Sequence, residues 1–232
     1  MESKHISNIK ICAIIVAAGE SRRMNGVDKL MAPLSGKPVL AWSIEAFQQN
    51  TRIDRIILVN NQNNLKPIEC LRIERKWTKV AEVCTGGKRR QDSVAAGLKL
   101  VGDCDWVIIH DGARPLVTQD LIERGIDAAK ECGAAIAAVP VTDTIKLAGN
   151  DQFVIETPPR SNLWAIQTPQ VFRFSVIKEA YEQAGGNVTD DASLVEQIGN
   201  KVKLYLGSYD NIKITTPHDL AIAELLIKKY VK

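Results

Sequence analysis

The chain has 232 residues and a formal net charge of +3, and its composition is 45% hydrophobic and 25% charged. This length and polarity are typical of a soluble globular protein with one large or two small domains. The small net charge argues against a nucleic-acid-binding protein, which needs an extended basic stripe, whereas local basic clusters suit a small anionic ligand.

Strand-like apolar runs alternate with amphipathic, helix-like runs along most of the chain. Strands are predicted at residues 11–18, 54–61, 79–85, 106–110, 134–141 and 201–207. Helices are predicted at residues 39–49, 63–77, 90–100, 119–132, 174–184, 191–198 and 218–231. Thr118 and Thr216 are expected to cap helices. The alternation predicts one α/β domain built on a mostly parallel, Rossmann-like sheet.

Residues 142–164 break this alternation. Two runs of alternating polarity, 144–148 and 152–156, flank a Gly-Asn-Asp turn, which is typical of a β-hairpin. A hairpin does not fit inside a parallel sheet, so we expect a projecting β-arm at about residues 141–166. The pattern alone leaves two roles open, a dimer interface and an antiparallel edge extension of the same subunit.

The cysteines and the N-terminus indicate the cellular location. The five cysteines are spread along the chain without a Cys-x-x-Cys pair, so neither a zinc site nor a redox motif is predicted. Cysteines beside apolar runs behave as small hydrophobic residues and suit a reducing compartment. The polar N-terminus leads into a short apolar run, which is neither a signal peptide nor a membrane span. We therefore expect a cytoplasmic protein.

The loop after the first predicted strand is a candidate phosphate site. The apolar run 11–18 ends at Gly19 and is followed by Arg22, Arg23 and Lys29. A small-residue turn directly after a buried strand lets backbone N–H groups approach phosphate oxygens, and basic side chains neutralise them. The spaced glycines of a dinucleotide fingerprint and the Gly-Lys-Ser/Thr of a P-loop are both absent. A solvated basic turn remains the alternative.

Asp111 is the candidate metal ligand. It follows the predicted strand 106–110, and the carboxyl ends of strands are where open α/β sheets bind ligands. Mg²⁺ commonly takes one or two carboxylates together with phosphate oxygens and waters. The alternative is an ion pair between Asp111 and Arg114 within the same turn. His110 is expected to be a hydrogen-bonded structural residue.

Two further segments carry basic residues. In the first, Gly86 and Gly87 lead into a helix whose first turn holds Arg90 and Ser93, which suits recognition of an anion or a base. In the second, Lys213 lies in a strand-like stretch between isoleucines. Such a lysine is more often an edge-strand residue that blocks aggregation than a catalytic group.

Taken together, these segments resemble one family, the 2-C-methyl-D-erythritol 4-phosphate cytidylyltransferases of the non-mevalonate isoprenoid pathway. The matching segments are AAGESRRM, DK, GGKRRQDSV, HDGARP, PVTDTIK, PPRSNLWAIQTPQ, TDDAS and DNIKITTP. They run in the same order over nearly the whole chain. The resemblance implies a Rossmann-like nucleotidyltransferase sheet with a protruding β-arm that builds a homodimer. It also implies Mg²⁺, or another divalent cation, as cofactor.

The resemblance also implies roles for individual residues. Catalytic contacts to the reacting phosphates fall on Arg23, Lys29 and Lys213. Contacts to CTP fall on Ala17, Ala18, Gly19, Gly87, Arg90, Ser93, Asp111 and Gly112, with Asp111 also at the metal. Contacts to methylerythritol phosphate fall on Thr144, Arg160, Thr168 and Thr189, with Thr144 and Arg160 supplied by the partner's arm.

Two other functions stay open. A pentitol-phosphate cytidylyltransferase, such as the ribitol 5-phosphate enzyme, shares the first loop, the HDxxRP segment and the NIK segment. The TDDAS and RSNLWAIQTPQ segments favour the isoprenoid-pathway enzyme over it. A non-catalytic nucleotide-binding regulator is the second alternative, and a crowded cationic site argues against it. Neither alternative involves a membrane or a nucleic acid.

Overall fold

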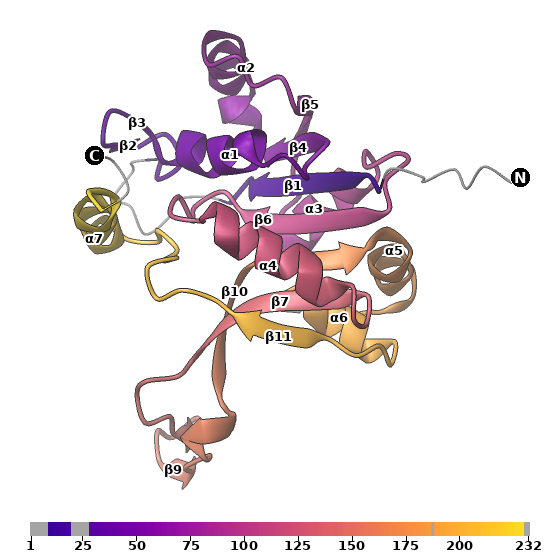
Figure 1. Ribbon diagram of the computed structural model, residues 1–232. Helices are drawn as coiled ribbons and strands as arrows, with labels where there is room; N and C mark the ends of the chain where they lie inside the picture. The colour runs from indigo at the N-terminus through magenta and orange to yellow at the C-terminus, as the bar shows by residue number, and fades with distance from the viewer. Residues whose placement is uncertain (1–8, 20–27, 187, 230–232) are drawn as a thin grey trace, which may run out of the picture.

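A twisted, mostly parallel sheet with helices on both faces forms the body of the molecule (Figure 1). The computed structural model describes residues 9–19, 28–186 and 188–229. The strands of the central sheet are β1 (Ile11–Ala17), β4 (Arg55–Asn60), β5 (Val80–Thr85), β6 (Trp106–Asp111), β7 (Ala134–Pro140), β10 (Trp164–Arg173) and β11 (Lys203–Leu206). They lie in the order β11-β7-β10-β6-β1-β4-β5, which confirms the predicted fold class.

The helices follow the predicted boundaries closely. They are α1 (Val39–Gln49), α2 (Leu65–Glu74), α3 (Arg90–Leu98), α4 (Gln119–Ala129), α5 (Phe174–Gln183), α6 (Ala192–Gln197) and α7 (Pro217–Ile227). Short 3₁₀ turns lie at Gln62–Asn64 and Arg160–Asn162. Thr118 Oγ1 accepts the Leu121 N–H at the start of α4, and Thr216 forms a capping box with Asp219 at the start of α7. Both predicted caps are confirmed.

Strand β1 is the centre of the sheet and of two cores. Its parallel neighbours are β4 and β6, so its side chains are covered on both faces. Ile15 packs into the core beneath α1, α2 and α4, whereas Ile14 packs beneath α3, α5 and α6. A strand buried on both faces gives a continuous apolar run, which is the pattern the sequence shows. Gly97 brings α3 close, because a Cβ there would lie 2.7 Å from Ile14 Cγ2.

Strand β10 is the one long element that the residue pattern does not predict. It runs antiparallel between β6 and β7, with a register shift between Ile166 and Gln170. Polar residues and Pro169, which follows a cis peptide bond, interrupt its apolar pattern. Proline within a run removes a hydrogen-bond donor from the ladder and argues against a central strand. Only its pairing with both neighbours makes this segment a strand.

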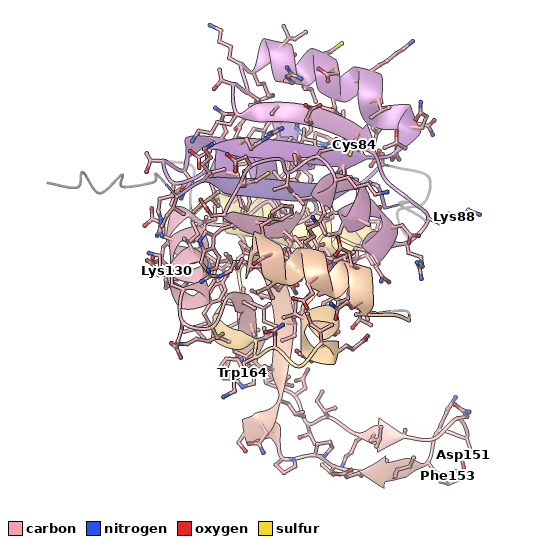
Figure 2. The ribbon with its side chains drawn as sticks, turned by 90° about the vertical axis from the view of Figure 1, so that its right-hand side faces the viewer. Cys84, Lys88, Lys130, Asp151, Phe153 and Trp164 are labelled. Atoms are coloured by element: carbon pink, nitrogen blue, oxygen red, sulfur yellow. The ribbon has the colours of Figure 1, made fainter. Side chains whose placement is uncertain are left out.

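The predicted hairpin is present as a projecting arm (Figure 1). Strands β8 (Leu147–Ala148) and β9 (Val154–Glu156) pair antiparallel. Figure 2 shows Asp151 and Phe153 at the far tip and Trp164 at the base of the arm. Residues 164–166 already pair with β7, so the last part of the predicted arm belongs to the central sheet. The side chains of β9 and of Phe153 are exposed.

A second small hairpin joins β2 (Pro33–Leu34) and β3 (Lys37–Pro38) just before α1. The strand-like interpretation of Lys213 is wrong, because residues 211–215 form a loop outside the sheet. In the parts of the chain that the structure covers, no helix is both long and apolar enough to cross a membrane. All five cysteines are free thiols.

Candidate active site

One cavity, called the first cavity below, lies at the carboxyl edge of the sheet, where the order of the strands reverses direction. From β1 the chain moves outward to β4 and β5, and it then returns to the other side of β1 at β6. Such a reversal leaves a crevice between the loops that follow neighbouring strands, and open α/β sheets bind ligands there. A cavity of about 600 Å³ lies here, lined by residues 16–19, 29–30, 87–90, Ser93, Asp111, Ala113 and Lys213.

Two loops meet at the floor of this cavity. Ala17, Ala18 and Gly19 line it from the end of β1, as the phosphate-loop hypothesis requires. Gly86, from the loop before α3, lies so close that a Cβ there would be 2.3 Å from the Ala18 Cβ. Only glycine fits at this contact, because real Cβ atoms do not approach so closely. The glycine therefore allows the two loops to pack closely.

The start of α3 forms one wall. Gly87 lines the cavity, and its N–H donates to Ser93 Oγ at 3.2 Å. The Ser93 hydroxyl in turn donates to the Arg89 carbonyl at 3.1 Å. Ser93 is thus buried and already hydrogen-bonded within the loop. In this structure the side chain shapes the glycine loop, and Arg90 is the longer group that reaches across the cavity.

Asp111 lies at the centre of a cluster of cations. Its Oδ1 accepts from Arg90 Nε at 3.0 Å, and its Oδ2 lies 2.9 Å from Lys213 Nζ. Arg114 Nε lies 3.6 Å from the same Oδ2. Burial by itself would raise the pKa of Asp111, but Arg90, Lys213 and Arg114 outweigh it and hold that pKa well below its usual value. The carboxylate is therefore ionised at neutral pH.

His110 is a structural residue, as expected. It is fully buried, and its Nε2 lies 3.2 Å from the Arg114 carbonyl, which can only accept. Nδ1 therefore accepts from the Thr168 hydroxyl at 3.1 Å, and that hydroxyl accepts the Asp111 N–H at 3.0 Å. Thr168 thus links β10 to the end of β6. This chain of hydrogen bonds fixes the backbone from which the Asp111 carboxylate projects.

Lys213 reaches the site from a loop that is anchored on both sides. On one side, the Asn211 amide donates to the Thr168 carbonyl at 2.9 Å. On the other side, Ile214 is fully buried, and its N–H donates to the Ala113 carbonyl at 2.8 Å. An anchored loop restricts the ammonium group to the neighbourhood of Asp111. Its neighbouring isoleucines are therefore anchors and not the partners of an edge strand.

A second cavity, of about 470 Å³, adjoins the first. Arg90, Asp111 and Lys213 line both cavities, so they form the wall between them. Of the residues predicted to contact the acceptor, Thr168 and Thr189 lie here. Four further polar residues lie beside them, namely Gln167, Gln170, Asp190 and Ser193. They belong to the RSNLWAIQTPQ and TDDAS segments, but no pattern in the sequence assigns any of them an individual role.

The remaining predicted residues lie elsewhere. Thr144 and Arg160 are exposed on the arm and line neither cavity, and Arg160 Nη1 donates to the Thr142 carbonyl at 2.7 Å. Gly112 does not line the first cavity, and a Cβ there would lie 2.8 Å from Leu40 Cδ1, so its role in the fold is close packing. Arg23 lies outside the described residues.

The charge of the first cavity favours a polyanion. Among the described residues that line it, the charged side chains are Lys29, Lys88, Arg89, Arg90, Lys213 and the single acid Asp111. Because the lining contains five bases and one acid, the cavity suits a ligand with several negative charges, such as a triphosphate. The described residues contain no cluster of three or more His, Cys, Asp or Glu side chains suited to a metal ion.

We predict that His110 makes stability depend on pH. Burial lowers the pKa of His110 from its usual 6.5 to about 3. Between these values the unfolded chain binds a proton that the folded chain does not, so this contribution is complete above pH 6.5 and is lost as the pH falls. The linkage relation gives a loss of about 2 kcal/mol between pH 7 and pH 5. Urea unfolding at both pH values measures it.

The His110→Gln variant provides the comparison for this measurement. Glutamine keeps one donor and one acceptor but does not titrate, so its pH-dependent loss should be smaller than that of the wild type by about 2 kcal/mol. An equal loss in both proteins would show that other groups cause the pH dependence.

Comparisons with known proteins agree with this geometry. A family model described as 2-C-methyl-D-erythritol 4-phosphate cytidylyltransferase matches residues 11–229. A protein of that name from Dehalococcoides mccartyi (strain ATCC BAA-2266 / KCTC 15142 / 195) is 53% identical over 222 residues, which cover 96% of this chain and 98% of the relative. One from Alkaliphilus oremlandii is 47% identical over 94% of this chain and 95% of the relative.

Solved structures give the same result. The 4-diphosphocytidyl-2C-methyl-D-erythritol synthase of Anaerococcus prevotii superposes with a TM-score of 0.85 and 32% identity, over 95% of this chain and 99% of that chain. The 2-C-methyl-D-erythritol 4-phosphate cytidylyltransferase of Thermus thermophilus superposes with a TM-score of 0.78 and 30% identity, over 95% of this chain and 100% of that chain. The family model, the sequence identities and the shared fold together show that the chain belongs to the 2-C-methyl-D-erythritol 4-phosphate cytidylyltransferase family.

Proposed function

We propose that the protein transfers CMP from CTP to 2-C-methyl-D-erythritol 4-phosphate and releases pyrophosphate. The observation that carries this proposal is the shared wall of Arg90, Asp111 and Lys213, which joins a strongly basic cavity to a polar one. Two anionic substrates, each in its own cavity, would meet at this wall. Family membership supplies the identity of the two substrates.

The reaction needs no general base. An oxygen of the acceptor phosphate attacks the α-phosphorus of CTP, and the bond to pyrophosphate breaks. A phosphate monoester has a second pKa of about 6, so it is mostly dianionic at neutral pH and already nucleophilic. His110, which directly precedes Asp111, is buried and neutral and lies at hydrogen-bond distance from partners at both ring nitrogens. It is therefore suited to hold the backbone in place and not to accept a proton.

The main obstacle is repulsion between two anions. Lys213 lines both cavities, so its ammonium group is placed to neutralise the attacking phosphate and the α-phosphate together. Lys29 lines the triphosphate side, and Arg23 is assigned to the same side by the family resemblance. Catalysis would consist of positioning the substrates and stabilising the charge that develops.

The remaining contacts divide between the substrates. Residues 17–19, Gly87 and Arg90 are placed to bind CTP, and Ser93 and Gly112 hold the loops around it. Thr168 and Thr189 face the acceptor side.

A divalent cation fits this site. Asp111 is ionised and lines both cavities, and Mg²⁺ typically needs only one or two carboxylates when phosphate oxygens and waters complete its coordination. We assign the Mg²⁺ contact to Asp111. When bound, the ion would neutralise phosphate oxygens and favour the departure of pyrophosphate.

We also propose that the arm joins two copies of the chain. Its exposed apolar side chains include Leu147, Phe153, Val154 and Ile155. An exposed apolar patch of this kind usually marks an interaction surface. In a homodimer, Thr144 and Arg160 of one chain would complete the acceptor cavity of the other. The free cysteines suit a cytoplasmic enzyme.

Pyrophosphate release from CTP tests the proposed function directly. With Mg²⁺ present, we expect release with methylerythritol 4-phosphate and none above background with ribitol 5-phosphate. Release with ribitol 5-phosphate alone would support cytidylyl transfer but exclude methylerythritol 4-phosphate as the acceptor. Absence of release with both acceptors, from folded protein that still binds CTP, would support the nucleotide-binding regulator.

We predict that Lys213→Ala lowers kcat by about 10²- to 10³-fold, the usual cost of removing one group that stabilises the charge of a transition state. Unfolding in urea should change far less than kcat, because Arg90 and Arg114 still neutralise Asp111 and the lysine side chain is 37% exposed. Lys130→Ala is a matched control, since it removes a surface lysine whose Nζ also lies 2.9 Å from an aspartate. A wild-type rate in the Lys213 variant would exclude the assigned role.

Mixed dimers test whether the arm completes the partner's site. Arg160→Ala and Lys213→Ala should each be nearly inactive alone. A mixed dimer carries one site with an intact Lys213 and an intact partner Arg160, so activity should return after the two variants are unfolded and refolded together. Lack of recovery in confirmed mixed dimers would show that Arg160 acts within its own chain.

A further inference from the structure

One buried carboxylate near the site has no role in the proposed reaction. Asp191 is 1% exposed and precedes α6, at the position of a helix N-cap. Its carboxylate caps no backbone group. The preceding Asp190 does this instead, because its Oδ1 accepts the Ser193 N–H at 3.2 Å. Helix capping therefore does not account for Asp191.

Both oxygens of Asp191 have other partners. Oδ2 accepts from Arg90 Nη1 at 2.7 Å, and Oδ1 accepts from the Tyr181 hydroxyl at 2.6 Å. Arg90 also donates through Nε to Asp111 at 3.0 Å. A continuous chain of hydrogen bonds thus runs from Tyr181 on α5, through Asp191 and Arg90, to the carboxylate between the two cavities.

We propose that Asp191 and Tyr181 are positioning residues for Arg90, and that they act on the reaction only through it. This inference rests on the proposed function, in which Arg90 contributes to the CTP site. Asp191 lines neither cavity, so it does not contact substrate in either of them.

Two partners hold the guanidinium more firmly than one. The group is planar and rigid, and its donors point in fixed directions. With Asp111 on Nε and Asp191 on Nη1, both ends of the plane are fixed, whereas either carboxylate alone would leave rotation about the side chain. The orientation of Arg90 toward the cavity is then set before CTP binds, which reduces the ordering required on binding.

Tyr181 fixes Asp191 in turn. Burial, and then the negative charge of Asp191, raise the pKa of Tyr181 above its usual value. The phenol therefore stays protonated and donates to Asp191 throughout the working range of pH. Because Tyr181 belongs to α5, Asp191 precedes α6 and Arg90 begins α3, the chain of hydrogen bonds ties the three helices on this face of the sheet to the site.

A purely stabilising role would not need these groups. Burying a carboxylate with an arginine often stabilises a fold less than apolar residues of the same volume would. The position adjoins an apolar core that contains Ala192, Leu194 and Val195. A charged pair at this place is better explained by the need to hold one guanidinium in one orientation.

The first test measures Arg90 itself. Exchange of the Arg90 Nε proton with water, followed by NMR and assigned through its loss in Arg90→Lys, reports how firmly the guanidinium is held. We expect slow exchange in the wild type, at least tenfold faster exchange in Asp191→Asn and an intermediate rate in Tyr181→Phe. Tyr205→Phe is the matched control, since it removes a buried hydroxyl that donates to the Pro169 carbonyl at 2.8 Å. Its Arg90 exchange should match the wild type.

The second test measures catalysis. A misplaced contact group can reduce activity by up to about 10²-fold, so Asp191→Asn should lower kcat/KM for CTP by roughly 10- to 100-fold. Tyr181→Phe should have a smaller effect. If Asp191 acts through Arg90, then Arg90→Gln with Asp191→Asn loses no more than Arg90→Gln alone. The proposal would be overturned if the losses of the two single variants multiplied in the double variant. It would also be overturned if the Arg90 exchange rate were unchanged in a folded Asp191→Asn protein.

The two proposals fail in different ways. An inactive wild type in which Asp191→Asn still accelerates Arg90 exchange would contradict the cytidylyltransferase reaction and retain the positioning role. An active wild type whose Arg90 exchange rate equals that of Asp191→Asn would support the cytidylyltransferase reaction and contradict the positioning role. If Asp191→Asn does not fold, Tyr181→Phe takes its place in both tests, because it removes one hydroxyl and leaves the ion pair between Asp191 and Arg90.

Discussion

The site depends on one buried carboxylate, Asp111, at the carboxyl end of β6. A lone carboxylate removed from water would be strongly unfavourable, so the fold supplies compensating cations. They come from three separated segments, with Arg90 on α3, Arg114 after β6 and Lys213 in the loop before α7. The need to neutralise Asp111 thus brings into one place the basic groups that a phosphate-transfer reaction also requires.

Rigidity around Asp111 comes from neutral groups. Thr168 accepts the Asp111 N–H and is hydrogen-bonded to His110, so both residues fix the backbone of Asp111. Asn211 holds the loop that carries Lys213 against the same threonine. These residues lie on β6, β10 and the loop before α7, so the antiparallel strand β10 links the end of β6 to the loop that carries Lys213. Arg90 differs, because a charged group, Asp191, holds it, and the neutral Tyr181 hydroxyl contacts that carboxylate in turn.

Most of the fold could be predicted from local patterns, because each pattern reflects where an element is buried. The apolar run of β1 indicates burial on both faces, and the caps at Thr118 and Thr216 mark helix starts. β10 could not be found in this way, since Pro169 and its polar neighbours resemble a loop until β6 and β7 lie on either side. Lys213 was wrongly interpreted as a strand residue for a related reason. Its neighbour Ile214 is buried by loop anchoring and Ile212 is partly buried, and sequence periodicity does not distinguish this from strand burial.

The fold class, the hairpin arm and the family could be predicted from the sequence, because apolar periodicity and glycine, proline and charged residues at fixed spacings act locally. Which of these residues share a cavity became clear only in three dimensions. Arg90 and Asp191 are separated by 101 positions, and no local pattern relates them. The tertiary structure also showed that Ser93 and Gly112 shape the loops around the cavity. The physical reason is that electrostatic partners are chosen by distance in space, which chain spacing reveals only within a single helix or turn.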